Sequence, residues 1–398
     1  MKTKTVYLDG ASNTPLSPKA YAAMKPFISK LYVGNSMSTH SYGVTSFEAV
    51  EKARKEMSHV LGIKPEELFF TSGATESNNW AIRSSTMAWR KEHPEGGHII
   101  CSALEHDSVI RCCEQMQDLY GIDISFVTPN PGLFVYRHGS LVSSDLLPLI
   151  RPDTFLICAM DINNELGIHN DIQGITELAN KLDIDTLIDC TQSFSLGGTR
   201  VAIGKSYPKA TFLSFSAHKF YGPTGVGGLI CRKKLLPLII GGAQEQGCRG
   251  GTTNVAGIIG MCAALKEVGE TDYSDHYGDL SRHLIQRTQE LSGIRYNSWG
   301  GNSIVSLNCS DILNMDHLAS ALDSYGIAVS AGSACDSTHD ETAGEFNGSH
   351  VLKAIGLTEK EIRNTIRISY TRYNTTKDID RLITALKDLV ALQKGDKI

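Results

Sequence analysis

The sequence lacks the long apolar runs and the charge excess that mark membrane proteins and nucleic-acid-binding proteins. No apolar run approaches the ~20 residues that a membrane-spanning helix needs. The opening stretch MKTKTVYLDGASNTP has no apolar core of the kind found in signal peptides, so we expect no signal peptide. The net charge of −5 gives no electrostatic reason to bind nucleic acid or an anionic membrane surface. We therefore expect neither a membrane partner nor a direct nucleic-acid partner.

The CxxC spacing is also missing, although the chain has ten cysteines. Their spacing is irregular and contains no CxxC, which argues against a disulfide framework and a metal site and favours a reducing cytoplasm. Most lie in apolar stretches such as FLICAM and LIDCTQ, which are typical of small core residues. Cys335 differs, because its surroundings at 330–350, SAGSACDSTHDETAGEFNGSH, are small, polar and glycine-containing. Taken alone, this segment is typical of a surface loop with an incidental cysteine.

The order of apolar runs predicts the fold class. The 398 residues are 41% apolar and 20% charged, which is ordinary for a globular enzyme with room for two domains. Up to about residue 255, short apolar runs alternate with helical patterns, and several runs show no polar alternation, as in strands buried on both faces. The predicted strands are 67–73, 98–104, 122–127, 154–162, 185–190, 210–216 and 226–233. This order predicts an α/β fold with a mainly parallel, doubly wound sheet.

The pattern changes after about residue 255, where two long helical segments lead into further short strands and a final helix. We predict a large α/β domain over 15–260. A smaller α+β domain would combine 1–14 with 261–398 and carry the Cys335 loop at about 328–350. No Pro/Gly/Ser linker separates the two, so we expect them to pack closely.

One helix start is suggested by local capping signals. Thr45 and Glu48 have the spacing of a capping box, and Gly62 is a suitable residue for a helix end. These signals predict a helix over 45–62.

The first candidate binding site follows the strand predicted at 67–73. Gly73 permits a tight turn in SGATESNN, and Ala74 and Thr75 then open a helix. Free N–H groups at a helix N-terminus, with the Thr75 hydroxyl, suit an anion such as phosphate. Taken alone, these residues are better explained by an ordinary helix cap.

Three later strands end in further polar residues. His106 lies in LEHDSV, where a solvent-facing or capping histidine is the plainer interpretation. Asn163 and Asn164 lie in INNELG, and Asp189 and Gln192 lie in DCTQS. A carboxylate at the end of a buried strand needs a cationic or donating partner, and a protonated ring nitrogen would serve Asp189.

Lys219 follows an apolar strand directly in LSFSAHKFYGPTGVGGL and precedes glycines. Burial disfavours a charged amine, and an uncharged amine can react with an aldehyde. Ser216 and His218 flank it and could donate to phosphate oxygens, while a plain surface charge remains the alternative for a lone lysine. Together these motifs supply the parts that hold pyridoxal 5'-phosphate.

The motif order resembles the cysteine desulfurases, the NifS/IscS-like branch of the class V, fold-type I pyridoxal-phosphate enzymes. The resemblance spans nearly the whole chain, from YLDGASNTP to the last helix. It rests on the motifs SGATESNN, EHDSV, NNELG, DCTQS, SFSAHKFYGPTGVGGL, RGGTTN, SAGSAC and IRISYTR.

This resemblance implies a set of cofactor contacts. Lys219 would bind the cofactor aldehyde, and Asp189 would pair with the pyridine N–H. Gln192 would contact the phenolic oxygen, and His106 would stack on the ring and act in acid–base steps. The implied phosphate ligands are Ala74, Thr75, Ser216, His218 and, across the interface of a homodimer, Thr252.

It also implies a substrate and a reaction. Asn164 and Arg367 would bind the carboxylate of L-cysteine, and Lys219 would remove the Cα proton. The Cys335 thiolate would attack the substrate sulfur, leaving L-alanine and a persulfide for transfer to an acceptor protein.

Several positions depart from the family pattern and suggest a specialised member. An insertion follows Cys335 before VLKAIGL, and YLDGASNTP stands where the family has YLDNAATTP. Single departures are Ala331, Asp336, Gln246, Gly250 and Thr371.

Other interpretations stay open. A selenocysteine lyase or another class V enzyme could use the same cofactor parts, whereas a transaminase leaves the loop thiol unexplained. A non-catalytic dimeric scaffold is opposed by the intact Lys219, Asp189, His106 and Cys335. The acceptor could serve iron–sulfur cluster assembly, tRNA thiolation or DNA sulfur modification.

Overall fold

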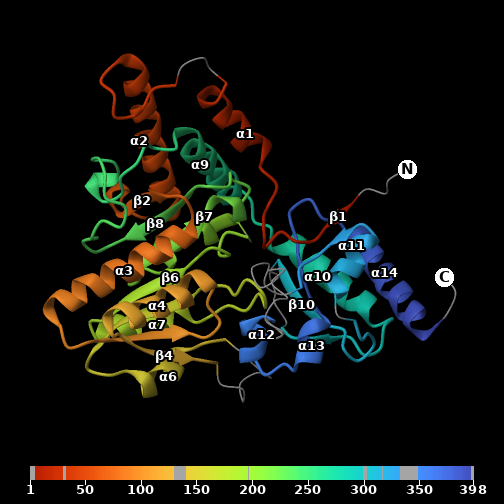
Figure 1. The fold of residues 1–398 in the computed structure, drawn as a ribbon. Coiled ribbons are helices and arrows are strands. Elements are labelled where there is room, and N and C mark those ends of the chain that lie inside the picture. The colour runs from red at the N-terminus through yellow and green to blue at the C-terminus, as the bar shows by residue number, and fades with distance from the viewer. Residues whose placement is uncertain are drawn as a thin grey trace.

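The largest element of the fold is a seven-stranded sheet (Figure 1). The structure is a computed structural model that describes residues 5–29, 33–129, 140–195, 197–298, 303–315, 317–331 and 348–395. The strand order is β2-β8-β7-β6-β5-β3-β4, and β3 to β7 run parallel to one another. Only β8 runs against its neighbours β7 and β2 within this sheet. The strands are β2 (Leu68–Thr71), β3 (His98–Ser102), β4 (Asp123–Val127), β5 (Thr154–Met160), β6 (Asp185–Asp189), β7 (Phe212–Ser216) and β8 (Gly227–Cys231). The prediction of a mainly parallel α/β sheet is confirmed.

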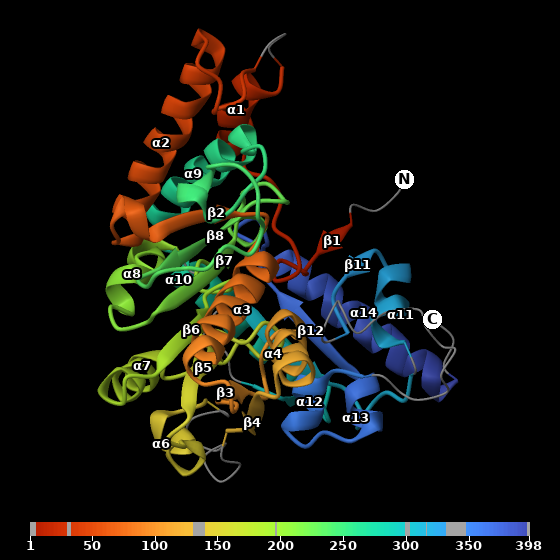
Figure 2. The same ribbon diagram turned by 60° about the vertical axis from the view of Figure 1, so that its left-hand side comes forward.

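Helices cover both faces of this sheet (Figure 2). On one side lie α3 (Ala74–Glu92) and α4 (Asp107–Tyr120), which share a core with alternate strand residues. On the other lie α2 (Ser41–Leu61), α7 (Ile172–Lys181) and α9 (Val255–Gly269). Since successive strand side chains point to opposite faces, burial on both faces explains the strands without polar alternation.

Shorter helices and turns complete this part of the chain. The α-helices are α1 (Pro18–Met24), α6 (Ser143–Leu146) and α8 (Ile203–Ser206). The 3₁₀ turns are η1 (Lys25–Phe27), η2 (Pro65–Glu67), η4 (Leu147–Leu149), η5 (Gly198–Val201), η6 (Ala217–Lys219) and η7 (Glu245–Gly247).

A second core forms around a three-stranded antiparallel sheet. Its strands are β9 (Arg295–Tyr296), β10 (Ile304–Asn308) and β12 (Thr365–Ser369). The helices of this region are α10 (Ser274–Thr288), α11 (Leu318–Ser324), α12 (His350–Ala354), α13 (Glu359–Arg363) and α14 (Thr376–Lys394). The N-terminus belongs here too, since β1 (Val6–Tyr7) pairs with β11 (Ile327–Ala328) and Leu8 lies in the same core. This distribution supports the predicted two domains, although α9 spans the boundary near 260 and the division stays a prediction.

The predicted start of the helix at Thr45 was wrong. α2 begins four residues earlier, at Ser41, because the His40 ring accepts a hydrogen bond from the backbone N–H of Gly43 at 3.2 Å. The Thr45 hydroxyl instead donates to the Ser41 carbonyl inside the helix. The end is as predicted, since Gly62 adopts the left-handed φ of 72° that ends many helices.

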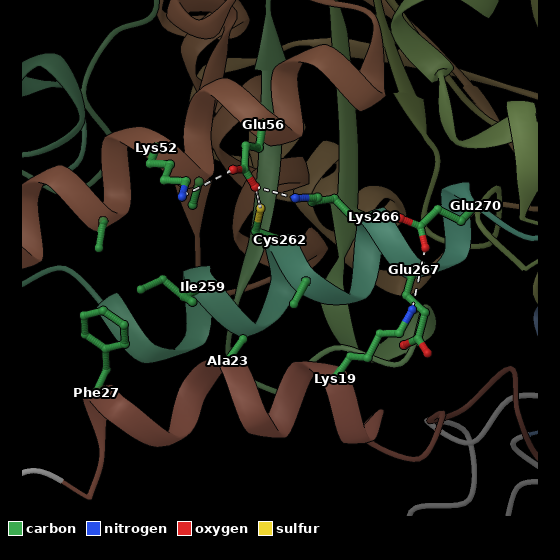
Figure 3. Close-up of a pocket in the computed structure, with 13 residues that line it drawn as sticks. Lys19, Ala23, Phe27, Lys52, Glu56, Ile259, Cys262, Lys266, Glu267 and Glu270 are labelled. Atoms are coloured by element: carbon green, nitrogen blue, oxygen red, sulfur yellow. Dashed lines mark hydrogen bonds and ion pairs between the residues drawn. The ribbon is translucent and has the colours of Figure 1, made fainter.

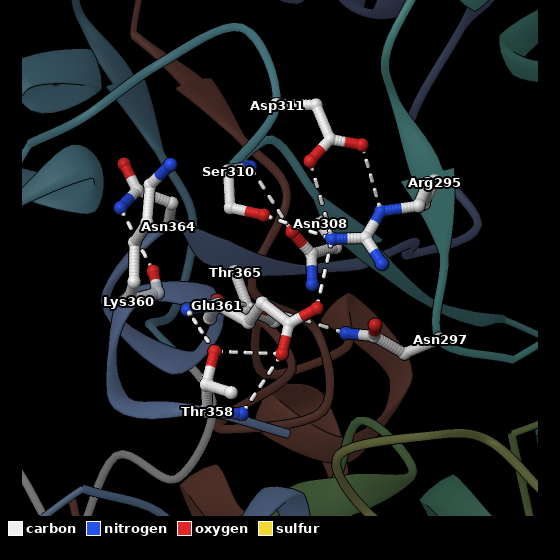
Figure 4. Close-up of polar contacts among 10 residues, drawn as sticks. All are labelled: Arg295, Asn297, Asn308, Ser310, Asp311, Thr358, Lys360, Glu361, Asn364 and Thr365. Carbon is white, nitrogen blue, oxygen red and sulfur yellow. Dashed lines mark hydrogen bonds and ion pairs between the residues drawn. The ribbon is translucent and has the colours of Figure 1, made fainter. Parts of the chain in front are cut away.

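A polar cluster joins α13 to β9 (Figure 4). Glu361 accepts the Thr358 backbone N–H at 2.8 Å and its hydroxyl at 2.7 Å, and Arg295 donates to it at 2.8 Å. These bonds, led by the backbone one, lower the pKa of Glu361 to about 2.

We expect Glu361→Gln to lower the melting temperature at neutral pH and to matter less in acid. The folded pKa lies below the unfolded value of about 4.3, so the carboxylate stabilises the fold above that pH and stops doing so as the pH falls towards 2. Because the group is close to solvent, the effect should stay under about 1 kcal/mol. Melting curves from pH 7 to pH 3 should show the two proteins converging. A difference that is constant with pH would show that the charge is not the cause.

No helix among the described residues is both long and apolar enough to cross a membrane.

Candidate active site

Predicted site residues meet at the carboxyl edge of the parallel strands. Asp189 is the last residue of β6, and Ser216 is the last residue of β7. His106 follows β3 and caps the N-terminus of α4. Parallel strands end at one edge of a sheet, which is where ligands bind in open α/β folds.

Asp189 is a buried carboxylate with donors around it but no cation. It is 5% exposed and accepts the Asn78 side-chain amide and the Thr191 backbone N–H, both at 2.9 Å. Within the described ranges no Lys, Arg or His forms an ion pair with it. Burial, and then the Asp189 charge, raise the pKa of nearby Glu105 well above its ordinary value. A protonated pyridine nitrogen fits such an acceptor.

The start of α3 forms a compact anion cradle with Ser216. The backbone N–H of Ala74 donates to the Ser216 hydroxyl at 2.7 Å. A Cβ at Gly73 would lie 3.1 Å from the same hydroxyl, so this close approach favours glycine. Thr75 is exposed in the first turn of the helix. The positive helix end and these donors fit a phosphate group.

Lys219 is half-buried at the end of η6 and bound by two carbonyls. Its Nζ donates to the carbonyl oxygens of Ala11 at 2.6 Å and Ser12 at 2.7 Å. Burial, and then the Lys219 charge, lower the pKa of His218 to about 4. His218 is therefore neutral at pH 7 and can donate one ring N–H to an anion.

The N-terminal strap, residues 9–14, ties several predicted site residues together. Besides Lys219, the Ala11 carbonyl accepts the Gln192 side-chain amide at 3.0 Å. The Thr14 hydroxyl donates to the His218 carbonyl at 2.9 Å. Sequence reasoning assigned no site residue here, although YLDGASNTP was one of the stretches that carried the resemblance.

Arg367 of β12 also reaches the strap. It is 2% exposed, and its Nη2 donates to Asp9 at 2.7 Å and to the Ser12 hydroxyl at 2.5 Å. Its Nη1 donates to the Asn164 carbonyl at 2.9 Å, so the two predicted carboxylate ligands lie together. The buried Nε has no hydrogen-bond partner among the residues that the structure describes. A buried guanidinium with a spare N–H suits an anionic substrate group.

Two buried residues that sequence reasoning did not assign, Asn78 and Ser108, connect Asp189 to His106. Asn78 donates to Asp189 and to the Ser108 hydroxyl, and Ser108 contacts the His106 ring. The usable signals were the position of Asn78 in SGATESNN and the serine two residues after a capping histidine.

Among the described residues, Thr252 forms no hydrogen bond with the other predicted site residues. Thr252 is exposed and lines a cavity of about 170 Å³ with Ser72 and Gly225. Cys335 lies outside the described residues. Both neighbouring described segments are anchored at the site. Ser330 pairs through its backbone with Arg367, and the Ser349 hydroxyl donates to Glu165 at 2.5 Å.

A separate cavity of about 430 Å³ lies between α1, α2 and α9 (Figure 3). Its lining charges are paired, as Lys266 with Glu56 at 2.8 Å and Lys19 with Glu270 at 3.6 Å show. Lys52 also pairs with Glu56, and Glu267 pairs with Arg372. The cavity therefore presents no unpaired charge for an ionic ligand.

Comparison with known proteins gives one consistent family. The aminotransferase class-V family model matches residues 6–382. A cysteine desulfurase IscS of Dictyoglomus turgidum is 36% identical over 397 residues, which cover 97% of this chain and 95% of the relative. A solved NifS-like protein has a TM-score of 0.82 and 30% identity over 98% of this chain and 99% of its own. A structure of SspA in complex with cysteine has a TM-score of 0.77 and 31% identity over 93% of this chain and 100% of its own.

The family uses pyridoxal 5'-phosphate, and the cradle at α3, the buried Asp189 acceptor and the Lys219 amine fit that cofactor. The chain belongs to the class-V aminotransferases and, among them, to the NifS/IscS-like cysteine desulfurases.

Proposed function

We propose that this protein converts L-cysteine to L-alanine and passes the sulfur through Cys335 to an acceptor protein. The proposal rests on one observation, which is that Lys219 and Arg367 both form hydrogen bonds with Ser12. Lys219 donates to the Ser12 carbonyl, and Arg367 donates to the Ser12 hydroxyl. Ser12 therefore binds both the amine proposed to react with the cofactor and the guanidinium proposed to bind the substrate carboxylate. This arrangement suits an α-amino acid, which carries its amine and its carboxylate on one carbon.

Each residue then has a task that its contacts support. Pyridoxal phosphate, when bound, supplies an electron sink for the bond changes at the substrate. Asp189 would accept a hydrogen bond from the ring nitrogen, and the α3 cradle and the neutral His218 would hold the phosphate. Arg367 binds the substrate carboxylate, which orients the Cα–H bond towards Lys219, the base at Nζ.

Cys335 is proposed as the nucleophile. It follows Ala331 by four residues, so an extended chain keeps its Cα within roughly 14 Å of that residue. Ser330, next to Ala331, pairs with Arg367. The thiolate attacks the substrate sulfur and the C–S bond breaks, with its electron pair left on carbon. Protonation of that carbon gives alanine, and Cys335 keeps the sulfur as a persulfide.

We also propose a homodimer in which Thr252 reaches the partner's phosphate site. Support comes from the exposed position of Thr252 and from exposed apolar side chains around α1 and α2. Tyr21 is 54% exposed, Ile28 is 59% and Phe47 is 51%, and a second copy would cover such a surface. The cytoplasm is proposed as the compartment, since the nine cysteines that the structure describes are all free thiols.

Incubating the reconstituted protein with L-cysteine tests the activity. We expect alanine to accumulate and Cys335 to gain one sulfur atom by mass spectrometry, because the thiol takes the sulfur. Cys335→Ser should abolish turnover, whereas Cys248→Ser, at a partly exposed cysteine, should not. Comparing kcat/KM for L-selenocysteine with kcat/KM for L-cysteine tests the alternative that the protein is a selenocysteine lyase.

Alanine formed without an adduct on Cys335 would contradict the assigned nucleophile. No alanine at all, from protein that has taken up the cofactor, would contradict the proposed reaction.

A further inference from the structure

A chain of buried hydrogen bonds runs from Asp189 to His106 and has no assigned role. The Asn78 Nδ2 donates to the Asp189 carboxylate at 2.9 Å and to the Ser108 hydroxyl at 3.0 Å. The Ser108 hydroxyl lies 2.9 Å from His106 Nδ1. Asn78 is 0% exposed and Ser108 is 9% exposed, so water does not compete freely for these bonds.

The chemistry of each group fixes the direction of the chain. An ionised carboxylate only accepts hydrogen bonds, so Asn78 must present its NH₂ group to Asp189. Its carbonyl oxygen then accepts the Ser214 hydroxyl at 2.5 Å, and Ser214 is also fully buried. Since the Ser108 hydroxyl oxygen accepts a hydrogen bond from Asn78, its own O–H is left to donate to His106.

A second bond from Ser108 decides where the ring proton lies. The backbone N–H of Ser108 points at His106 Nδ1 at 3.0 Å, and a backbone N–H can only donate. Nδ1 therefore acts as an acceptor and carries no proton. A neutral imidazole with an accepting Nδ1 carries its proton on Nε2.

We propose that Asn78 and Ser108 are positioning residues that hold His106 as the Nε2-protonated tautomer. His106 then carries its N–H donor at Nε2, and it cannot serve as a base at Nδ1. The same Asn78 amide group orients the Asp189 carboxylate, so one residue orients the acid for the cofactor ring and the histidine beside it. The catalytic consequence rests on the proposed function, but the tautomer does not.

Nitrogen-15 spectra of histidine-labelled, full-length protein test the inference, and His106→Gln identifies the His106 signals. In the holoenzyme, and again after the cofactor is removed, we expect an unprotonated Nδ1 and a protonated Nε2. A His106 with its proton on Nδ1 would overturn the proposal without any variant. Because no turnover is involved, an inactive desulfurase would leave this result intact.

Variants test whether the chain of bonds is the cause. Ser108→Ala and Asn78→Ala should each raise the population of the minor tautomer by about fivefold, as expected for losing one net hydrogen bond. Ser108→Thr, which keeps the hydroxyl, should restore the wild-type signals. Asn79→Ala is the matched control, since Asn79 bonds only to the backbone oxygens of Thr75 and Ser108 among described residues. Unchanged spectra in both folded alanine variants would overturn the positioning role.

Discussion

Replacing Lys219 by alanine should stop the reaction with L-cysteine and prevent covalent capture of pyridoxal phosphate. Two proposed functions would be lost at once, since we propose the amine as both the attachment point for the cofactor and the base. We expect a loss of roughly 10³-fold or more in kcat, the range for removing a positioned proton-transfer group. Borohydride reduction followed by peptide mass spectrometry measures the capture, and alanine release measures turnover.

Lys209→Ala provides the control, because Lys209 is an exposed lysine close in sequence to Lys219. It should keep both capture and turnover. The assignment of Lys219 fails if the Lys219→Ala protein still yields a reduced cofactor–lysine peptide at wild-type level.

Arg367→Lys should raise the KM for L-cysteine by about 10²-fold, although the charge is kept. The guanidinium donates hydrogen bonds to Asp9, Ser12 and Asn164 at the same time. Its Nε has no hydrogen-bond partner among the described residues and is therefore the N–H that a ligand would bind. A lysine has one nitrogen on a flexible stem and cannot replace a planar fork of donors. Breaking a buried pair costs about 3–5 kcal/mol, and the substrate carboxylate loses its rigid partner in the same change. Steady-state kinetics measures the loss of substrate binding, and a thermal melt measures any loss of stability.

The same substitution at Arg363 serves as the control, because that side chain pairs with Glu359 on the outside of α13. Arg363→Lys should leave KM unchanged. An Arg367→Lys protein with the wild-type KM and melting temperature would remove Arg367 from the carboxylate site.

The site residues that could be predicted from the sequence are those that directly follow a predicted strand. Asp189, Ser216 and Lys219 follow apolar runs directly, and the carboxyl edge of a parallel sheet then brings them together. The direction of β8 could not be predicted, because a short apolar run looks the same in parallel and antiparallel pairing. The start of α2 was wrong because a histidine ring took the capping role that Thr45 and Glu48 suggested.

The contacts that sequence could not predict join distant segments. Lys219 and Ala11 are 208 positions apart, and no local pattern states which carbonyl a lysine will find. Asn78 lies within the motif SGATESNN, but its hydrogen bond to Asp189 depends on how α3 packs across β6. The role of Cys335 stays a prediction, because it lies outside the described residues.

The N-terminal strap has a consequence for how the protein is made. Asp9 and its partner Arg367 are 358 positions apart, so the strap leaves the ribosome long before the guanidinium does. The sheet from β2 to β8 can form while translation continues, since domains fold as units during synthesis. The Asp9–Arg367 pair cannot form so early, because it joins the strap to β12. If Arg367 binds the substrate carboxylate as proposed, a chain that ends before β12 lacks that ligand even when its large sheet has formed.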